Sequence, residues 1–423
     1  MAVLLILLAL LGAPLFAVIG ASALWGFHSE EVDLQVVSVE IYRLAEMPVL
    51  LAIPLFTFAG YLLGESGAPA RLVRATRAWL GWMPGGLALI SLIACALFTA
   101  FTGASGVTIV ALGALLFPAL LQAGYHERYT LGLITTSGSL GLLFAPSLPL
   151  ILYAVVAQQV DLDQPVAVDD LFLAGILPGL LMIALLAAWS WFSQPAARAR
   201  HRFDRSEALD SLRETVWELP LPLLVLGGIY GGYITVTEAA SVTAVYVLLV
   251  EVFILREIPL RAVPRIARES MVLVGAIMII LGVSLASTNY LIDAEIPTLL
   301  FEKIRGLIDD RWTFLILLNG FLLILGMMLD IFSALVIMIP ILLPIAVGYG
   351  IHPVHLGIIF LANMQLGYFT PPVGMNLFIA SFRFRRPVMD IYRATLPFFF
   401  LLLVAVLIIT YWPALSLTLP GLD

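Results

Sequence analysis

Three polar stretches lie inside long apolar runs, where polar side chains are costly unless they have a role. "TTSGSLG", residues 135–141, combines hydroxyls with glycines, and "FTGASG", residues 101–106, forms a small polar turn. Asp330 is the single carboxylate of the apolar run 313–350. Hydroxyl and carbonyl oxygens in a broken membrane helix suit an alkali cation, and the N-terminal end of the next half-helix suits an anion.

The first two stretches offer ligands that carry no charge. The break contains Ser137, Gly138 and Ser139, and the turn contains Thr102, Gly103 and Ser105. An unwound helix in hydrocarbon is tolerated only where protein or an aqueous cavity satisfies its backbone groups. The turn can reach the break only if its hairpin dips to mid-membrane. Close helix packing is the alternative explanation for such small residues.

Asp330 has two possible roles. A carboxylate at the membrane centre costs roughly 2.5 to 3.5 kcal/mol on insertion scales, so it usually has a partner. It can shape the turn through hydrogen bonds, or it can bind a cation, and the residues favour neither. Nearby polar side chains and accessible glycine carbonyls come from Asn363, Thr370, Asn376, Gly326, Gly367 and Gly374.

Composition identifies the elements that must position these residues. The 423-residue chain is 62% hydrophobic and 12% charged, and its apolar residues occur in blocks of membrane-spanning length. A soluble protein of this size needs more surface charge. One cysteine, Cys95, excludes a disulfide framework, and the absence of HExxH and GxSxG motifs argues against an intramembrane enzyme.

Charge in the loops predicts sidedness. All but four of the 21 Lys and Arg residues lie in segments that read as cytoplasmic, whereas residues 158–170 hold four Asp and no base. The runs 84–124 and 313–350 are twice the length of one crossing, so each is either two crossings or a re-entrant hairpin. The first enters from the cytoplasm and the second from the opposite side.

An internal repeat links the two long runs. A gapless shift of 226 residues superimposes Leu116 on Leu342, Pro118 on Pro344, Gly124 on Gly350, His126 on His352, Leu140 on Leu366, Gly141 on Gly367 and Pro146 on Pro372. Each half therefore has a hydrophobic hairpin followed by a helix broken by Gly and Pro. Since charge places the hairpins on opposite sides, the repeats are inverted, which is a pattern typical of transporter binding sites.

These observations predict an all-α polytopic membrane protein with inverted repeats. We expect N-terminal scaffold helices in 1–83, a first transport repeat in 84–192, a cytoplasmic connector with scaffold helices in 193–270, and a second repeat in 271–423. The repeats contain hairpins at 84–124 and 313–350, broken helices at 129–157 and 354–382, and a last helix at 396–416. Glu238 in "TVTEAA" is expected to cap or pack a helix.

Long ordered motifs now carry a family resemblance. "FTGASGVTIVALGALLFPAL", "TTSGSLGLLFAPSLPLILY", "ITVTEAASVTAVY" and "GMMLDIFSALVIMIPILLPIAVGYGIHPVHLGIIFLANMQLGYFTPPVGMNLFIAS" resemble the large membrane subunit of TRAP (tripartite ATP-independent periplasmic) transporters. The likeness extends over essentially the whole chain.

The resemblance implies secondary active uptake by a multi-pass protein of the bacterial inner membrane. It implies an elevator-type transport domain with two re-entrant hairpins, Na⁺ as the coupling ion and no other metal or cofactor. The implied partners are a small membrane subunit of about four helices, a periplasmic substrate-binding protein, a small carboxylate substrate and the lipid bilayer. Nucleic acid is not among them.

The family's sites also map onto this chain. The first sodium site maps onto Thr102, Gly103, Ser105, Ser137, Gly138 and Ser139. The second maps onto Gly326, Asp330, Asn363, Gly367 and Thr370, and the substrate is expected between the tips at Ser105, Ser137 and Asn376. Many members have a run of serines at the first tip. Here Thr102 keeps a hydroxyl, but Ala104 does not.

Other functions stay open on the residues alone. A stand-alone ion-coupled carrier of organic anions would need no binding protein. A scaffold subunit without a transport pathway would tolerate Ser105→Ala, Ser137→Ala and Asp330→Ala. An intramembrane enzyme would need a nucleophile and base, or metal ligands, at membrane depth.

Overall fold

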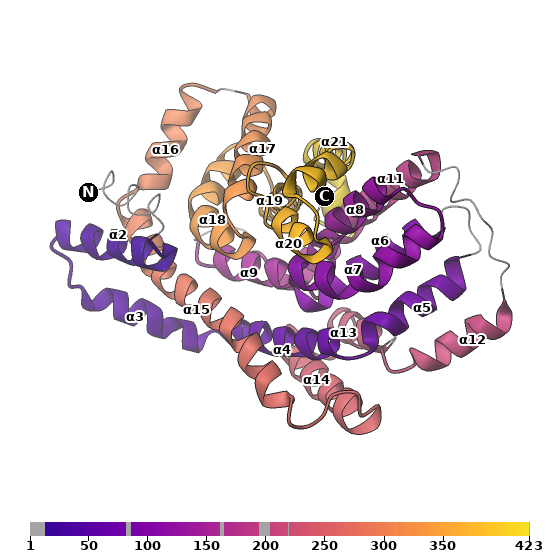
Figure 1. The fold of residues 1–423 in the computed structure, drawn as a ribbon. Helices are drawn as coiled ribbons and strands as arrows, with labels where there is room; N and C mark the ends of the chain where they lie inside the picture. Colours follow the sequence, from indigo (N-terminus) through magenta and orange to yellow (C-terminus); the bar gives the residue numbers. More distant parts are fainter. Residues whose placement is uncertain are drawn as a thin grey trace.

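The computed structural model describes residues 13–81, 86–160, 165–193, 204–218, 220–308 and 310–422 (Figure 1). All regular elements in these ranges are helices, and eight of the described helices are long and apolar enough to cross a membrane. The predicted all-α polytopic architecture is confirmed. Residues 1–12 of the expected N-terminal range 1–83 lie outside the described residues.

The helices follow one another in this order: α2 (Leu15–Ser29), α3 (Gln35–Arg43), α4 (Ala52–Glu65), α5 (Ala68–Leu80), α6 (Gly86–Thr102), α7 (Ser105–Gln122), α8 (Glu127–Ser137), α9 (Leu148–Ala157), α10 (Val168–Ala174), α11 (Ile176–Ser193), α12 (Arg205–Glu214), α13 (Pro220–Tyr230), α14 (Val236–Leu248), α15 (Val263–Asp293), α16 (Ile296–Arg305), α17 (Arg311–Met328), α18 (Ile331–Gly348), α19 (Pro353–Gly367), α20 (Met375–Phe384), α21 (Val388–Tyr411) and α22 (Ala414–Leu417).

A layer of helices runs along one side of the molecule. In Figure 1, α3, α4, α14 and α15 lie along the lower edge, with the hairpins and broken helices above them. Helix α15 runs unbroken through Val263–Asp293, so the boundary expected between residues 270 and 271 falls inside it. At 1.5 Å per residue the helix is about 46 Å long, which exceeds the hydrocarbon thickness of a bilayer. Its first turns therefore carry exposed arginines such as Arg268.

Both long apolar runs are helical hairpins with two-residue turns. Helices α6 and α7 are joined through Gly103 and Ala104, and α17 and α18 through Leu329 and Asp330. Gly103 has φ +64°, a left-handed conformation that favours glycine over residues with a side chain. Both tips contact the breaks of the helices that follow, and the first is buried at Thr102, Gly103 and Ser105, whereas the second is half-buried at Leu329 and Asp330.

The two broken helices form the centre of the molecule. Helix α8 ends at Ser137, a short 3₁₀ turn covers Leu140–Leu143, and α9 begins at Leu148 after a bend of 44°. In the second half α19 ends at Gly367 and α20 begins at Met375. Every residue of α9 and of α19 is buried. Both breaks contain a cis X–Pro bond, at Ala145–Pro146 and Pro371–Pro372.

The 226-residue shift relates residues that occupy equivalent places. Gly141 packs against α6, where an added Cβ would lie 2.4 Å from the Ala100 nitrogen. Gly367 packs against α17, where a Cβ would lie 2.5 Å from the Cα of Gly326, the counterpart of Ala100. The repeat is therefore a property of the packing, in which each break leans on its own hairpin through a glycine.

Two buried hydrogen bonds also match under the shift. The Tyr129 hydroxyl contacts the Ser190 hydroxyl, and His355 Nδ1 lies 3.1 Å from the Ser416 hydroxyl. The shift of 226 positions relates Tyr129 to His355 and Ser190 to Ser416. At the centre, the Ser139 hydroxyl donates to the carbonyl of Gln365, its own counterpart, at 3.4 Å. The two breaks therefore meet at residues that are equivalent under the shift.

Polar groups at the ends of the scaffold helices are paired. Arg71 in α5 forms ion pairs with Glu218, Glu251 and Glu257, which tie α5 to the segments around α13 and α14. Glu238 and Thr235 form a capping box at the start of α14, so the predicted capping role of Glu238 is confirmed.

Candidate functional site between the two hairpin tips

The first hairpin is joined to the first break by hydroxyls. The Thr99 hydroxyl lies 2.8 Å from the Gly138 carbonyl and 2.6 Å from the Thr108 hydroxyl. A Cβ on Gly138 would lie 3.3 Å from the Ser105 carbonyl, so the tip and the break are in van der Waals contact. The structure therefore brings the predicted first-site residues together. Thr99 makes the link, although its hydroxyl was not singled out in the sequence.

The first hairpin also reaches the second broken helix. The Ser105 hydroxyl donates to Asn376 Oδ1 at 2.7 Å, and the Asn376 amide lies 3.4 Å from the Thr135 carbonyl. All three residues are buried. Ser137, the third residue expected to bind substrate, turns its hydroxyl toward the Ile134 carbonyl of its own helix. The contact between Ser105 and Asn376 thus joins the two repeats beside both breaks.

The second tip is held to its break mainly by backbone. The Gly374 N–H donates to the Met327 carbonyl at 3.2 Å, across the close contact of Gly326 with Gly367. The Tyr368 hydroxyl accepts a hydrogen bond from the Ile331 N–H at 2.9 Å. Thr370 is half-buried, and its hydroxyl donates to the Leu366 carbonyl at 2.7 Å.

Asp330 is the N-cap of α18. Its Oδ1 accepts from the N–H groups of Phe332 and Ser333, each at 3.0 Å, and its Oδ2 accepts from the Ser333 hydroxyl at 2.5 Å. The carboxylate therefore shapes the tip through hydrogen bonds, which is one of the two roles expected for it. An ionised carboxylate has about four lone-pair sites, so these three bonds still leave room for a cation.

Asn363 lies away from the second tip. Its amide donates to Asn319 Oδ1 and to the Ile359 carbonyl, both at 2.8 Å. The Thr410 hydroxyl also donates to Asn319 Oδ1, at 3.1 Å. Asn319 is two turns of α17 before Gly326, so this buried network of Asn319, Asn363 and Thr410 connects α17, α19 and α21. In the sequence, Asn319 stands out only because it is a polar residue inside the apolar run 313–350.

Several buried oxygens around the breaks have no hydrogen-bond partner among the described residues. They are Thr102 Oγ1, Ser147 Oγ, Asn363 Oδ1 and Gln365 Oε1. A buried polar atom without a partner is costly. Hard neutral oxygens of this kind fit an alkali cation, and Thr102 and Asn363 were among the residues expected to bind sodium. Gln365 was not expected, although it lies in the second break's helix.

Comparison with known proteins identifies the family. The sequence profile described as "Tripartite ATP-independent periplasmic transporter, DctM component" matches residues 1–415. The C4-dicarboxylate TRAP transporter large permease protein DctM of Rhodobacter capsulatus is 36% identical over 99% of this chain and 98% of its own. The isethionate TRAP transporter permease protein DctMQ of Oleidesulfovibrio alaskensis is 34% identical over 88% of this chain and 58% of its own.

A solved structure shares the fold. The YdaH transporter of Alcanivorax borkumensis superimposes with a TM-score of 0.65 over 89% of this chain and 87% of its own, at 18% identity. The relatives named above are transporter permeases and not enzymes. With its membrane-spanning helices, the chain is a multi-pass protein of the bacterial inner membrane. The chain therefore belongs to the DctM family, the large permease subunits of TRAP transporters.

Proposed function

We propose that this permease imports a small organic anion, a carboxylate, together with sodium ions. The observation that carries the proposal is the buried contact of Ser105 with Asn376, which places polar groups of both repeats between the two tips. The names of two relatives at 36% identity state C4-dicarboxylates as their substrates, which supports a carboxylate.

The anion site is proposed at the first tip. Helix α7 begins at the buried Ser105 and has no side-chain cap, so its N-terminal N–H groups and their positive partial charge lie in the interior without a side-chain partner. Helix α18, by contrast, has its N-terminus capped by Asp330. A carboxylate bound by Ser105, Ser137 and Asn376 would take the place at α7 that Asp330 takes at α18.

Sodium is proposed on both sides of this anion. The first site would use Thr102, Gly103, Ser105, Ser137, Gly138 and Ser139, and the second Gly326, Asp330, Asn363, Gly367 and Thr370. The unpartnered oxygen of Thr102 supports the first site. The unpartnered Oδ1 of Asn363, one turn before Gly367 on the face of α19 that contacts α17, supports the second site. Positive charge on both sides would lower the cost of bringing a carboxylate to mid-membrane.

Transport is proposed to follow an elevator mechanism with two partner proteins. The separate scaffold layer gives the hairpins and broken helices a surface to slide against (Figure 1). A periplasmic binding protein would deliver the anion, and a small membrane subunit would extend the scaffold. The DctMQ relative, of which this chain matches only 58%, is long enough to contain such a subunit.

Uptake in proteoliposomes tests the proposal. The chain is reconstituted with its small subunit and binding protein, and uptake of radiolabelled succinate is measured under an inward sodium gradient and under a proton gradient alone. Sodium-dependent uptake that Ser105→Ala abolishes supports the proposal. Uptake driven equally by protons rejects the sodium coupling. Uptake by this chain without partners would favour the alternative, a stand-alone carrier.

A further inference from the structure

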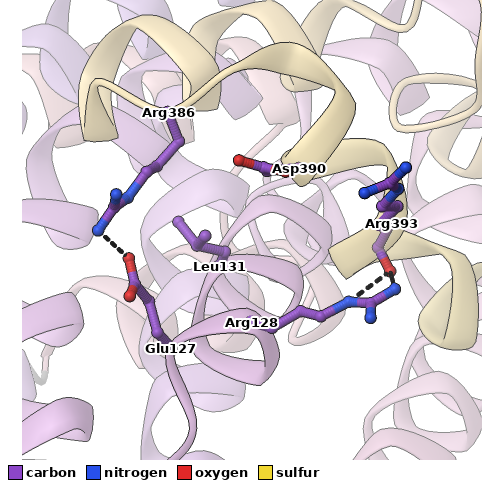
Figure 2. Close-up of a pocket in the computed structure, with 6 residues that line it drawn as sticks. All are labelled: Glu127, Arg128, Leu131, Arg386, Asp390 and Arg393. Carbon is purple, nitrogen blue, oxygen red and sulfur yellow. Dashed lines mark hydrogen bonds and ion pairs between the residues drawn. The ribbon is translucent and has the colours of Figure 1, made fainter.

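Far from the tips, charged side chains of both repeats surround a surface hollow of about 360 Å³ (Figure 2). Its walls are formed by Glu127, Arg128, Leu131, Arg386, Asp390 and Arg393. The first three belong to α8, Arg386 to the loop after α20, and the last two to α21. The volume lies in the range of small-molecule sites, at its lower end.

Internal pairing leaves positive charge in the hollow. Arg386 forms an ion pair with Glu127, and Arg128 donates through Nε and Nη2 to the backbone carbonyl of Arg393, at 3.2 and 2.8 Å. Within the described part of the chain, the guanidinium of Arg393 and the carboxylate of Asp390 form no ion pair (Figure 2). Three arginines thus face two carboxylates.

The walls are held in place before any ligand arrives. The Ser381 hydroxyl donates to the Arg386 carbonyl at 2.6 Å and the Arg386 N–H donates back to the Ser381 carbonyl at 3.1 Å, so the loop after α20 is closed. Arg128 is fixed across the hollow by its bonds to α21. Planar guanidinium donors recognise carboxylate and phosphate, and here Arg128 is held beside the Arg393 guanidinium, which has no ion-pair partner among the described residues.

The excess of Lys and Arg in cytoplasmic loops explains why arginines occur in this region, but it does not explain why they surround one hollow. Cytoplasmic loops need only an excess of Lys and Arg, spread over their length. Here five charged side chains from three segments border one hollow. Two of these segments lead to the central site, because Thr135 lies seven residues after Arg128 in α8 and Asn376 lies ten residues before Arg386, or about 10 and 15 Å along a helix.

We propose that this hollow is an oxyanion site, distinct from the central one, that binds a carboxylate or phosphate group between Arg128 and Arg393. The group comes either from a free anion on the cytoplasmic side or from the headgroup of an anionic lipid, since the arginines lie at the expected membrane surface. Asp390 repels the anion and keeps its affinity low, so that it exchanges readily.

Binding of inorganic phosphate tests this directly. The full-length chain is placed in phosphatidylcholine nanodiscs, in sodium-free buffer of low ionic strength, and titrated with phosphate in a calorimeter. We expect saturable binding that Arg393→Gln weakens by about tenfold, as expected for loss of a charge-assisted hydrogen bond. Asp390→Asn should strengthen binding by about threefold, because it removes an exposed like charge. A folding defect would shift both variants in the same direction.

Arg268→Gln is the matched control. It removes the same charge from an exposed position of α15 outside the hollow, and we expect unchanged affinity. Phosphatidylglycerol added to the nanodiscs identifies the source. If phosphatidylglycerol competes with phosphate in the parent protein and not in Arg393→Gln, the ligand is a lipid headgroup. If phosphatidylglycerol does not compete, the ligand is a free anion. Absence of saturable binding, or equal effects of Arg393→Gln and Arg268→Gln, would overturn the proposal.

Discussion

The two repeats share one backbone plan but hold their hairpin tips by different chemistry. The first tip turns through Gly103 and Ala104 and presents hydroxyls, with no side chain capping α7. The second places Asp330, the counterpart of Ala104, where it caps α18 with three hydrogen bonds. A duplicated fold has therefore kept its glycine contacts and changed its charges. The uncapped N-terminus remains free to attract an anion, and the carboxylate remains available to attract a cation.

A second difference lies behind the breaks. The Asn319, Asn363 and Thr410 network of the second repeat has Ile93, Ser137 and Ala184 at the corresponding positions of the first. The second broken helix is thus joined to α17 by a hydrogen bond between two amides, and α17 is joined to α21 by the Thr410 hydroxyl. The first is joined to its hairpin through Thr99.

The largest loss of stability is expected at the glycine contact between break and hairpin that the two repeats share. Gly141→Ala would bring a Cβ within 2.2 Å of the Ala96 carbonyl, and Gly367→Ala within 2.5 Å of the Gly326 backbone. Because backbone cannot yield without moving the hairpin, each change should cost about 3 kcal/mol. Thermal unfolding of the purified chain, followed by tryptophan fluorescence, measures this. Gly320→Ala in α17 has open space around it and should be neutral or stabilising. If Gly367→Ala matches that control, the shared packing role is wrong.

Disrupting the Asn319, Asn363 and Thr410 network should lower the stability of the protein by a smaller amount. Asn319→Ile installs the residue of the first repeat and leaves the Asn363 amide short of a partner, which should cost about 1 to 2 kcal/mol. Adding Asn363→Ser, again the residue of the first repeat, should recover part of the loss. Unfolding temperatures of the two single variants and the double variant give the coupling. Strictly additive losses would show that the two side chains do not stabilise one another.

Substitutions of Asp330 distinguish its role as a helix cap from a role in cation binding. Asp330→Ala should destabilise the chain by about 1 kcal/mol through loss of the cap, whereas Asp330→Asn should retain the cap and the stability. If the charge binds sodium, both variants should raise the sodium concentration for half-maximal uptake, by roughly tenfold for a loss of 1.4 kcal/mol. Normal sodium dependence in Asp330→Asn would assign this residue to the tip's structure alone.

The smallest change in stability is expected at the first tip. Thr102→Val keeps the shape and removes an oxygen that has no partner among the described residues, so stability should change by less than about 0.5 kcal/mol. Sodium-dependent uptake should nevertheless require more sodium. Thr136→Val is the control, because that hydroxyl is bound to the Gly132 carbonyl at 2.7 Å and is outside the proposed site. Equal sodium dependence in both variants would remove Thr102 from the site.

Much of the architecture was predicted from the sequence because its signals are local. Membrane spans follow from runs of apolar residues, and breaks follow from Gly and Pro inside those runs. The repeat follows from the recurrence of both at a fixed offset, and its inversion from the charges of the loops. Four long motifs in a fixed order, from "FTGASGVTIVALGALLFPAL" to the stretch that begins "GMMLDIFSAL", were enough to indicate the family, and the profile match confirmed it.

Contacts between distant residues were decided by the tertiary structure. Ser105 meets Asn376 because the hairpin of one repeat packs against the broken helix of the other, which no spacing reveals. Asn319 was one polar residue in an apolar run, and only packing shows that it faces α19 and not lipid. The sequence alone determined which residues can bind ions, since oxygen chemistry is a property of each side chain. Which oxygens share a site depended on how two inverted halves fold against each other.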